Sequence, residues 1–335
     1  MKVVAIFGHK KAGLVEMTDP KPKNDIVLVR IHAAPMCTEY HEFIEGHVGN
    51  NFGHEAAGEI VAVDKTTHFK IGDRVVVQPQ RSCGECYLCR QGDFIHCEHT
   101  RNYLEETGSE TGNATMAQYM LQSESYLTKI PEGMSYDHAV MACCGLGPTF
   151  GAMQLMNVDA FDTVLISGLG PVGLGGVINA RYRGARVIGI DTNPYRSELA
   201  KELGAVAVID PRTEGALQGI LDLTRGIGVD KAIETSGSPQ SKQFIAEAVR
   251  RKGKIAFVGW SGEIMASTII AKGLSVYGAW HYNINDVGRL MKVIEESSGQ
   301  LDKLITHIFP MSQIQEAWET QLSGKCAKVI LHPWD

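Results

Sequence analysis

The stretch SGLGPVG, residues 167–173, constrains the fold of this chain more than any other segment. It places Gly168, Gly170 and Gly173 in the spacing G-x-G-x-x-G, directly after the apolar run TVLI and before a segment of helical character. Asp191 ends the next apolar run, 18 residues after Gly173. A glycine-rich turn between a strand and a helix, with an acidic residue ending the following strand, is the complete dinucleotide-binding fingerprint.

This fingerprint predicts which groups contact a dinucleotide. Two glycines allow a tight turn and a close approach of the backbone to the pyrophosphate, while the third allows the helix to contact the strand. The start of the helix offers free N–H groups and the positive end of its dipole. We therefore predict a pyrophosphate site made by Gly168, Gly170, Pro171, Val172 and Gly173.

The same motif indicates which cofactor is bound. The Asp191 carboxylate would accept hydrogen bonds from the adenosine ribose and repel a 2′-phosphate, so NAD is favoured over NADP. Arg196 lies five residues further on, and as a cation near this position it could tolerate the phosphate. The alternative is a glycine-rich turn that binds no ligand.

Strands and helices alternate from Phe161 to Trp280. Six apolar runs read as strands, and helical patterns separate several of them; the runs are 163–170, 186–191, 205–210, 229–237, 254–259 and 273–280. Right-handed crossovers between such strands produce a parallel, doubly wound sheet. The first 150 residues or so instead contain short β segments broken by Gly, Pro and Asp. After Trp280, two amphipathic helices (284–299 and 311–324) and a closing strand (328–333) are expected.

Four cysteines lie close together in the β-rich part. Cys83, Cys86, Cys89 and Cys97 have the spacing C-x2-C-x2-C-x7-C. Four thiolates in one short loop can close a tetrahedron around Zn²⁺, and a closed shell leaves no position for a substrate. We therefore predict a structural zinc site in a lobe at about residues 81–100. An iron–sulfur cluster is the competing possibility, and a hydride-carrying cofactor gives it no one-electron partner.

Composition excludes several classes of partner. The 335-residue chain has a net charge of −6 and no long run of Lys or Arg, which argues against nucleic acid or an anionic membrane as the main partner. No apolar stretch approaches the ~18 residues of a membrane-spanning helix, and the N-terminus lacks a signal-peptide core. A cytoplasmic location is the default expectation. The eight cysteines are then metal ligands or reduced thiols.

Together, these features resemble the zinc-containing medium-chain dehydrogenases, which include alcohol, polyol and threonine dehydrogenases. The matching motifs are GHEAAGEIVAVD, GDRV, GLGPVG, SGKCAKVILHP and the four-cysteine lobe. The resemblance covers essentially the whole chain. It implies an α/β protein with a GroES-like, β-rich catalytic domain at 1–147 and 283–335 around a Rossmann cofactor domain at 148–282.

The resemblance also implies a catalytic zinc with three protein ligands and one open position. His54 of GHE is one ligand, with Glu55 beside the metal, and Cys144 is another by its place in ACCGLGPTFG. Cys143 is an adjacent thiol that could substitute for Cys144. The remaining ligand is the cysteine of the pattern Cys-x-Ser/Thr-Asp-x-His, and here this chain departs from the family.

The departure is an offset of one residue. Thr38, Glu39 and His41 keep the mutual spacing of the family's Thr, Asp and His, but the cysteine position holds Met36 and the sulfur comes at Cys37. Either a shortened loop still brings Cys37 to the metal, or the first ligand is lost. A methionine thioether suits Zn²⁺ poorly. We predict that Cys37 is the ligand, since His54, Glu55 and Cys144 are all present.

Further roles follow from the resemblance alone. The Thr38 hydroxyl and His41 would relay the substrate proton to solvent, and Glu39 would accept a hydrogen bond from the second nitrogen of His54. Thr149 is expected to contact the nicotinamide. Lys328 is expected to contact the pyrophosphate.

The leading hypothesis is a zinc-dependent, NAD-linked enzyme that oxidises a secondary alcohol such as a polyol, sugar or cyclitol. One alternative is an enzyme directed at primary alcohols or aldehydes, which a cysteine at position 144 favours over the glutamate of the polyol branch. Another is a non-catalytic NAD- and zinc-binding regulatory protein that has lost the catalytic metal. The resemblance further suggests a homodimer or homotetramer.

Overall fold

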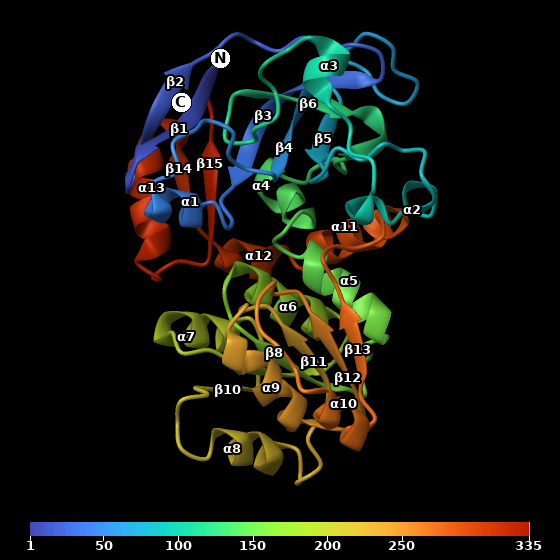
Figure 1. Ribbon diagram of the computed structural model, residues 1–335, viewed down its shortest axis with the longest axis vertical. Coiled ribbons are helices and arrows are strands. Elements are labelled where there is room, and N and C mark those ends of the chain that lie inside the picture. Colours follow the sequence, from blue (N-terminus) through green and yellow to red (C-terminus); the bar gives the residue numbers. More distant parts are fainter. Residues whose placement is uncertain (335) are drawn as a thin grey trace. The chain divides into compact units, whose positions relative to one another are not determined.

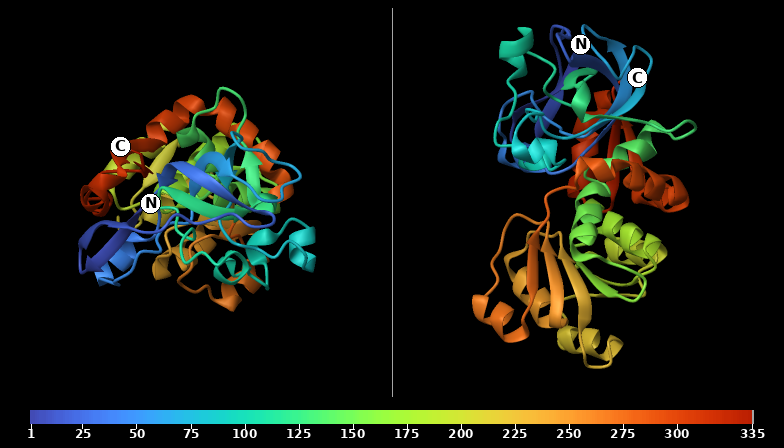
Figure 2. Two further views of the ribbon diagram at one scale, coloured as in Figure 1. Left: turned by 90° about the horizontal axis from the view of Figure 1, so that it is seen from above. Right: turned by 90° about the vertical axis from the view of Figure 1, so that its right-hand side faces the viewer.

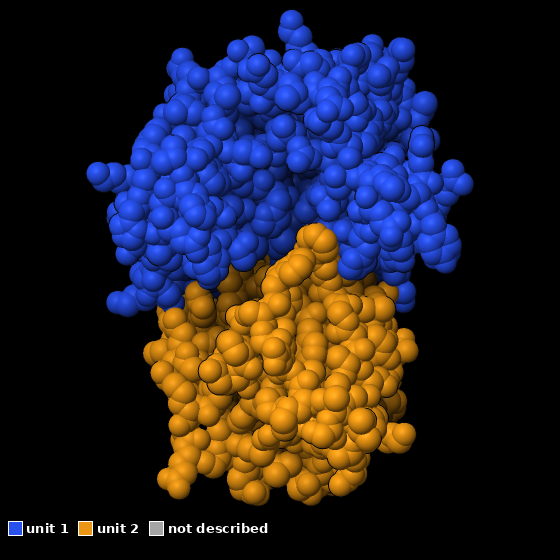
Figure 3. Space-filling model, viewed as in Figure 1, with its two compact units in different colours: residues 1–144, 283–295, 305–335 blue, residues 145–282, 296–304 orange. Residues whose placement is uncertain are grey.

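The computed structural model describes residues 1–334 and divides the chain into two compact units (Figure 3). Unit 1 contains residues 1–144, 283–295 and 305–335, and unit 2 contains residues 145–282 and 296–304. Unit 1 is therefore assembled from both ends of the chain. The bounds predicted for the functional domains, 1–147 with 283–335 and 148–282, remain a prediction, and the compact units differ from them mainly at 296–304.

Unit 2 is built on a six-stranded parallel sheet (Figure 1). Its strands are β8 (Thr163–Ser167), β9 (Arg186–Ile190), β10 (Ala207–Ile209), β11 (Val229–Glu234), β12 (Val249–Phe257) and β13 (Ser275–Gly278). They follow the order β10-β9-β8-β11-β12-β13, so the direction of winding reverses between β8 and β11. All six predicted strands are confirmed. In such a sheet a ligand binds beyond the carboxyl ends of the strands at the point of reversal.

Helices cover both faces of this sheet, as the right-hand view of Figure 2 shows. The helices of unit 2 are α5 (Gly147–Met156), α6 (Pro171–Tyr182), α7 (Pro194–Glu202), α8 (Ala216–Leu223), α9 (Pro239–Ala248), α10 (Ala266–Lys272) and α12 (Ser298–Leu304). Helix α6 contacts α5, α7 and α12, whereas α9 contacts α8 and α10. The short helices α8 and α10 were not predicted from the sequence.

Unit 1 holds a seven-stranded sheet and a separate hairpin. The sheet strands are β3 (Ile26–Pro35), β4 (Ala56–Ala62), β5 (Arg74–Val77), β6 (Tyr119–Ser123), β7 (Leu127–Lys129), β14 (Ile305–Pro310) and β15 (Lys328–His332), and the hairpin pairs β1 (Lys2–Gly8) with β2 (Lys11–Glu16). Strand β15 lies antiparallel to β3, with Ile330 opposite Pro35 and Leu331 opposite Ala34. The last strand of the chain is thus fixed beside one of the first.

Short helices complete unit 1 around an apolar core. They are α1 (Tyr40–Glu45), α2 (Tyr87–Arg90), α3 (Tyr103–Thr107), α4 (Tyr136–Ala139), α11 (Val287–Glu296) and α13 (Ile314–Leu322). Phe43 of α1 stacks on Trp318 of α13 with ring centroids 4.7 Å apart, and both side chains are fully buried. Strand β14 was not predicted, because its sequence ITHIFP is short and only partly buried.

Within residues 1–334, no single helix is long and apolar enough to cross a bilayer. One bent pair of helical segments, 136–142 with 147–156, meets that test by length and composition only. Most of its residues are buried in the protein, and buried core helices pass the same test.

Candidate active site

Four donor side chains converge at one place in unit 1. A sulfur of Cys37, a ring nitrogen of His54, a carboxylate oxygen of Glu55 and the sulfur of Cys144 all lie within 4.8 Å of one another. His54 and Glu55 directly precede β4, Cys37 follows β3, and Cys144 lies just before unit 2 begins. His54 Nε2 is 3.2 Å from Cys144 Sγ. The structure therefore brings together the three predicted ligands and the acidic residue expected beside them.

The offset of Cys37 is accommodated by the extended backbone at the end of β3. The Met36 N–H donates to the carbonyl of Val329 at 2.9 Å, which fixes this segment against β15. The Met36 side chain is 1% exposed and packs in the core. The next side chain, that of Cys37, lies instead with the donor atoms of His54, Glu55 and Cys144. Gln321 Nε2 donates to the Cys37 carbonyl at 2.6 Å and holds it there.

Glu39 orients His54. One Glu39 oxygen lies 2.7 Å from His54 Nδ1, and the other accepts a hydrogen bond from the Cys37 N–H at 3.0 Å. The partner predicted for His54 is therefore in place. A carboxylate on one ring nitrogen fixes the tautomer and leaves the other nitrogen free to bind a metal.

Beneath these groups, Glu55 and Lys328 form a buried ion pair. Glu55 is 0% exposed and Lys328 is 1% exposed, and their charged atoms are 2.7 Å apart. The second Glu55 oxygen accepts a hydrogen bond from the Cys144 N–H at 3.1 Å. A buried carboxylate requires a compensating partner, and the Lys328 ammonium is directed at Glu55. The expected contact of Lys328 with a pyrophosphate remains a prediction.

Burial and hydrogen bonds shift the pKa values of the groups at this site. The Cys144 thiol donates to Cys37 and, against the effect of burial, keeps the pKa of Cys37 well below its usual value. Burial disfavours the charged form of His54, yet hydrogen bonds to Cys37 and Glu39 raise its pKa to about 11. Burial raises the pKa of Glu55 to about 7. Because Zn²⁺ binds thiolates and neutral imidazole, zinc binding would displace protons from this site.

The proposed proton relay lies at the surface of unit 1. Thr38 and His41 are both exposed, and the His41 N–H donates to the Thr38 carbonyl at 3.0 Å. The His41 ring lies 4.1 Å from that of Tyr40. Thr38 directly follows Cys37 and His41 lies in the first turn of α1, and their catalytic role remains a prediction.

A pocket of about 500 Å³ opens beside His54. Apart from Glu39 and His54 it is lined by residues 42 and 47–53, whose polar members are Glu42, His47, Asn50 and Asn51. Glu42 accepts a hydrogen bond from the His47 ring. We did not predict this lining from the sequence. The polar, glycine-containing run EGHVGNN, which lies shortly before GHE, is the sequence feature that could have indicated this lining.

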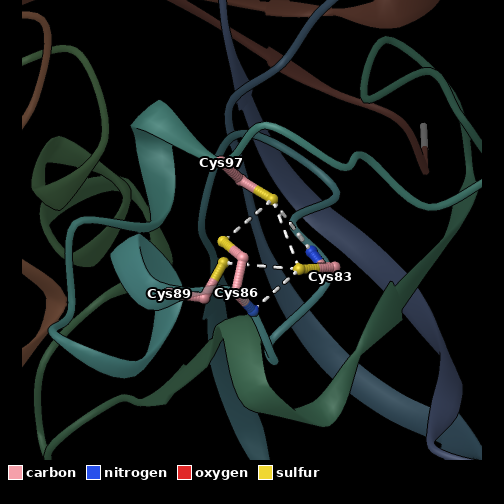
Figure 4. Close-up of side chains that lie close together, drawn as sticks. All are labelled: Cys83, Cys86, Cys89 and Cys97. Carbon is pink, nitrogen blue, oxygen red and sulfur yellow. Dashed lines mark hydrogen bonds between the residues drawn. The ribbon is translucent and has the colours of Figure 1, made fainter.

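The four lobe cysteines point toward a common centre (Figure 4). Their sulfurs are 3.9 Å apart for Cys83 and Cys89, 4.0 Å for Cys86 and Cys97, and 3.6 Å for Cys83 and Cys97. A tetrahedron with Zn–S bonds of about 2.3 Å has edges of about 3.8 Å. The sulfur positions therefore fit a closed tetrahedral zinc site.

The lobe is hydrogen-bonded to residues 283–284, where the chain re-enters unit 1 after unit 2. Asn283 Nδ2 donates to the Gln91 carbonyl at 2.8 Å and to Asp93 at 2.9 Å, and the Ile284 N–H donates to the Gly92 carbonyl at 2.9 Å. Gly92 has φ +90°, and a Cβ there would lie 2.1 Å from Asn283 Oδ1. This attachment joins positions about 190 residues apart, so no local pattern could reveal it.

In unit 2, the glycine-rich turn has the shape that the fingerprint requires. Gly168 has φ +85°, and Gly170 is the N-cap of α6. A Cβ on Gly173 would lie only 1.8 Å from the Gly168 carbonyl oxygen, so the helix contacts the turn directly. Asp191 Oδ2 accepts a hydrogen bond from the Leu169 N–H at 2.5 Å. Asp191 thus lies against the turn at the point where the sheet reverses direction.

Arg196 and Thr149, two other residues predicted to contact the cofactor, have different surroundings. The Arg196 guanidinium approaches the turn, with Nη1 4.0 Å from the position of a Cβ on Gly170. Thr149 is fully buried, and its hydroxyl donates to the Leu146 carbonyl at 3.2 Å and accepts from Asn179 at 2.9 Å. Both hydrogen-bonding roles of the Thr149 hydroxyl are thus used inside unit 2, and its expected contact with the nicotinamide remains a prediction.

Comparison with known proteins decides the family. The zinc-binding dehydrogenase family matches residues 171–296, and the alcohol dehydrogenase GroES-like domain matches residues 22–132. The chain is 30% identical to a sorbitol dehydrogenase of Bacillus subtilis, over 99% of this chain and 97% of that protein. It belongs to the zinc-binding alcohol dehydrogenase family. The dehydrogenase is also 30% identical to an L-threonine 3-dehydrogenase of Pyrococcus abyssi, over 98% of each chain.

Solved structures agree with this assignment. A zinc-dependent alcohol dehydrogenase from Streptococcus pneumonia superposes with a TM-score of 0.85 at 28% identity, covering 100% of this chain and 99% of that one. The fold is therefore a GroES-like, β-rich unit together with a Rossmann unit, as predicted. The dehydrogenase is an alcohol-type oxidoreductase with zinc and NAD as its cofactors. Both predicted metal sites fit zinc: the lobe by its sulfur–sulfur distances, and the other site by its thiolate, imidazole and carboxylate donors.

Proposed function

We propose that this dehydrogenase oxidises a neutral, polyhydroxylated secondary alcohol with NAD. The observation that carries the proposal is the convergence of Cys37, His54 and Cys144 beside a polar pocket. Three protein donors next to a solvent-accessible space are what a catalytic zinc requires, because the substrate occupies the fourth position.

Each residue then has a defined task. Cys37, His54 and Cys144 hold the zinc ion, and Glu39 keeps His54 in the tautomer that binds it. Bound there, zinc supplies the Lewis acidity that lowers the pKa of an alcohol oxygen. Thr38 and His41 carry the released proton toward solvent. In unit 2, the turn from Gly168 to Gly173 binds the pyrophosphate, and Asp191 binds the adenosine ribose.

The pocket beside His54 supports the choice of substrate. Its polar lining consists of carboxylate, amide and imidazole groups, and no Lys or Arg is among its lining residues. Such a lining offers many hydrogen-bonding partners to substrate hydroxyls. It offers a phosphate ester neither a lysine nor an arginine, and the His47 ring is already paired with Glu42. The sorbitol and threonine dehydrogenases among the relatives also act, by their names, on substrates with polar groups.

The test combines a substrate panel with metal analysis. Polyols, a sugar phosphate, L-threonine and primary alcohols are assayed with NAD by the absorbance of the reduced cofactor, and zinc is counted in the same preparation. Two zinc ions per chain and the highest kcat/KM for a neutral polyol are expected. Highest activity with primary alcohols would favour the alternative enzyme. A single zinc and no activity would favour the non-catalytic alternative.

A matched pair of variants tests the ligand assignment. Cys37→Ala is expected to lose one zinc and the activity while the lobe zinc stays bound. Cys143→Ala removes an adjacent thiol that is fully buried and donates to the Val77 carbonyl, so it serves as the control and should retain both metals. If Cys37→Ala retained two zinc ions, the ligand assignment would be wrong.

We also propose a cytoplasmic homodimer. All eight cysteines are free, which suits a reducing compartment. Strand β13 ends the sheet of unit 2 with an open edge, and nearby apolar side chains are exposed: Val276 by 37%, Trp260 by 79% and Ile270 by 79%. An open edge with exposed apolar groups favours pairing with a second chain. Val276→Lys should lower the mass measured by light scattering to that of a monomer, and an unchanged mass would exclude this edge.

A further inference from the structure

A second pocket lies in unit 1 on the same strands that lead to the metal site. It has a volume of about 370 Å³, and its lining includes His32, Arg74, Tyr136, Asp137, His332 and Trp334. This volume is within the range of small-molecule sites, about 300–1,000 Å³. Nothing in the proposed reaction uses these residues.

Position along the strands separates this pocket from the metal site. His32 lies on β3 five residues before Cys37, and His332 lies on β15 four residues after Lys328. At about 3.3 Å per residue, these intervals correspond to about 13–16 Å along the extended chain. The two sites are therefore distinct, but the same pair of hydrogen-bonded strands carries both.

Arg74, which lines the pocket, and Arg30, which contacts the lining residue Trp334, are both stacked on aromatic rings. The Arg74 guanidinium lies 4.5 Å from the centre of the Tyr136 ring, and that of Arg30 lies 4.2 Å from the Trp334 ring. Arg74 donates one hydrogen bond, to the carbonyl of Met134 at 2.5 Å. Among residues 1–334, neither arginine forms an ion pair, and Arg30 Nε is buried without a hydrogen-bond partner.

His32 adds an unsatisfied nitrogen to the pocket. Its ring stacks on Tyr136 with centroids 4.4 Å apart and planes 5° apart, and its Nε2 is buried without a hydrogen-bond partner. Burial and the charges of Arg30 and Arg74 lower the pKa of His32. A neutral His32 can donate from Nε2 to an anion, and a buried nitrogen with no partner is costly unless a ligand or water supplies one.

Two carboxylates of the described residues lie near the pocket, those of Asp137 and Glu59. Asp137 is already paired with His332 at 2.8 Å. Glu59 lies opposite both Arg30 and Arg74 in the strand register but forms an ion pair with neither within the described residues. Among residues 1–334, Glu59 is thus the acidic residue that lies opposite both guanidinium groups in the sheet.

We propose that this pocket binds a small organic anion. The Arg74 guanidinium and His32 Nε2 would bind a carboxylate or a phosphate group, and the rings of Tyr136 and Trp334 would contact the rest of the molecule. An arginine fork matches the planar, two-oxygen geometry of such groups. The ligand is not the substrate, and binding does not require NAD.

The test is a binding measurement on the zinc-loaded full chain. Isothermal titration with succinate and with glycerol 3-phosphate should show one site per chain with Kd below about 1 mM, a binding free energy of about −4 kcal/mol. The probe that binds with the lower Kd shows whether the site prefers a carboxylate or a phosphate. Arg74→Met should weaken binding at least roughly tenfold, because it removes a charge-assisted hydrogen bond.

Two further variants keep this test decisive. His32→Phe retains the stacking on Tyr136 but removes Nε2, so it should also weaken binding without disturbing the fold. Arg183→Met serves as the matched control, since Arg183 stacks on Phe150 in unit 2 at 5.3 Å. Zinc content and NAD affinity should stay unchanged in all three variants. No saturable binding of either probe, or equal weakening in Arg183→Met, would overturn the proposal.

Discussion

Replacing Lys328 with methionine tests how the metal site is supported. The change removes the cation from a pair whose members are 0% and 1% exposed, while keeping most of the side-chain volume. Glu55, whose pKa burial already raises to about 7, would then lose the cation that favours its charged form. Breaking a buried pair in this way costs about 3–5 kcal/mol of unfolding free energy. In a unit of this size, each kcal/mol lowers Tm by about 2–4 °C, so a decrease of roughly 6–20 °C is expected.

Scanning calorimetry of the zinc-loaded enzyme and of the chelator-treated protein measures this decrease. A double-mutant cycle with Glu55→Gln isolates the pair, because the double variant leaves no uncompensated charge. We expect the double variant to be more stable than Lys328→Met alone, with a coupling of about 2 kcal/mol or more. If Lys328→Met lowered Tm by less than about 2 °C, or if the two effects simply added, the ion pair would not support the site.

Three further outcomes are expected. Gly173→Ala should reduce kcat/KM for NAD roughly hundredfold, since its Cβ would lie 1.8 Å from the Gly168 carbonyl and force the turn to move; unchanged kinetics would contradict the close contact. Asp191→Asn should raise the preference for NADP roughly tenfold or more, as measured by the ratio of kcat/KM values, because it removes repulsion of the 2′-phosphate. Hydrogen bonds from Arg101 lower the pKa of Asp25, so its contribution to stability is present above about pH 4 and is lost as the pH falls through the folded-state pKa. Asp25→Asn should therefore reduce Tm at pH 7 and flatten its decrease below about pH 4, and an unaltered acid profile would exclude this role.

Local patterns predicted the cofactor unit well. Its strands are apolar runs bounded by glycine or charged residues, and the glycine spacing fixes the shape of the turn whatever lies elsewhere in the chain. The lobe cysteines were predictable for the same reason, since all four lie within fifteen residues. The site residues His54, Glu55 and Cys144 depended instead on resemblance, because their spacing along the chain says little about their distance in space.

Predictions were weakest where distant segments decide the environment of a side chain. The contact of Lys328 with Glu55 spans 273 residues, and nothing around Lys328 in the sequence reveals a buried carboxylate beside it. The Thr149 hydroxyl likewise accepts a hydrogen bond from Asn179 on a neighbouring helix, which no local pattern indicates. For Cys37 the sequence left two possibilities open, and the backbone hydrogen bond from Met36 to Val329 now explains how its sulfur reaches the other donors.

The pairing of β3 with β15 also has a consequence for biosynthesis. Cys37, His54 and Cys144 leave the ribosome long before Lys328 and the strand that anchors the cysteine segment. Until the residues of β15 emerge, the nascent site lacks both its buried cation and one side of its sheet. Stable zinc insertion should therefore occur only after β15 has been synthesised, and a chain stopped before β15 should bind zinc at the lobe alone.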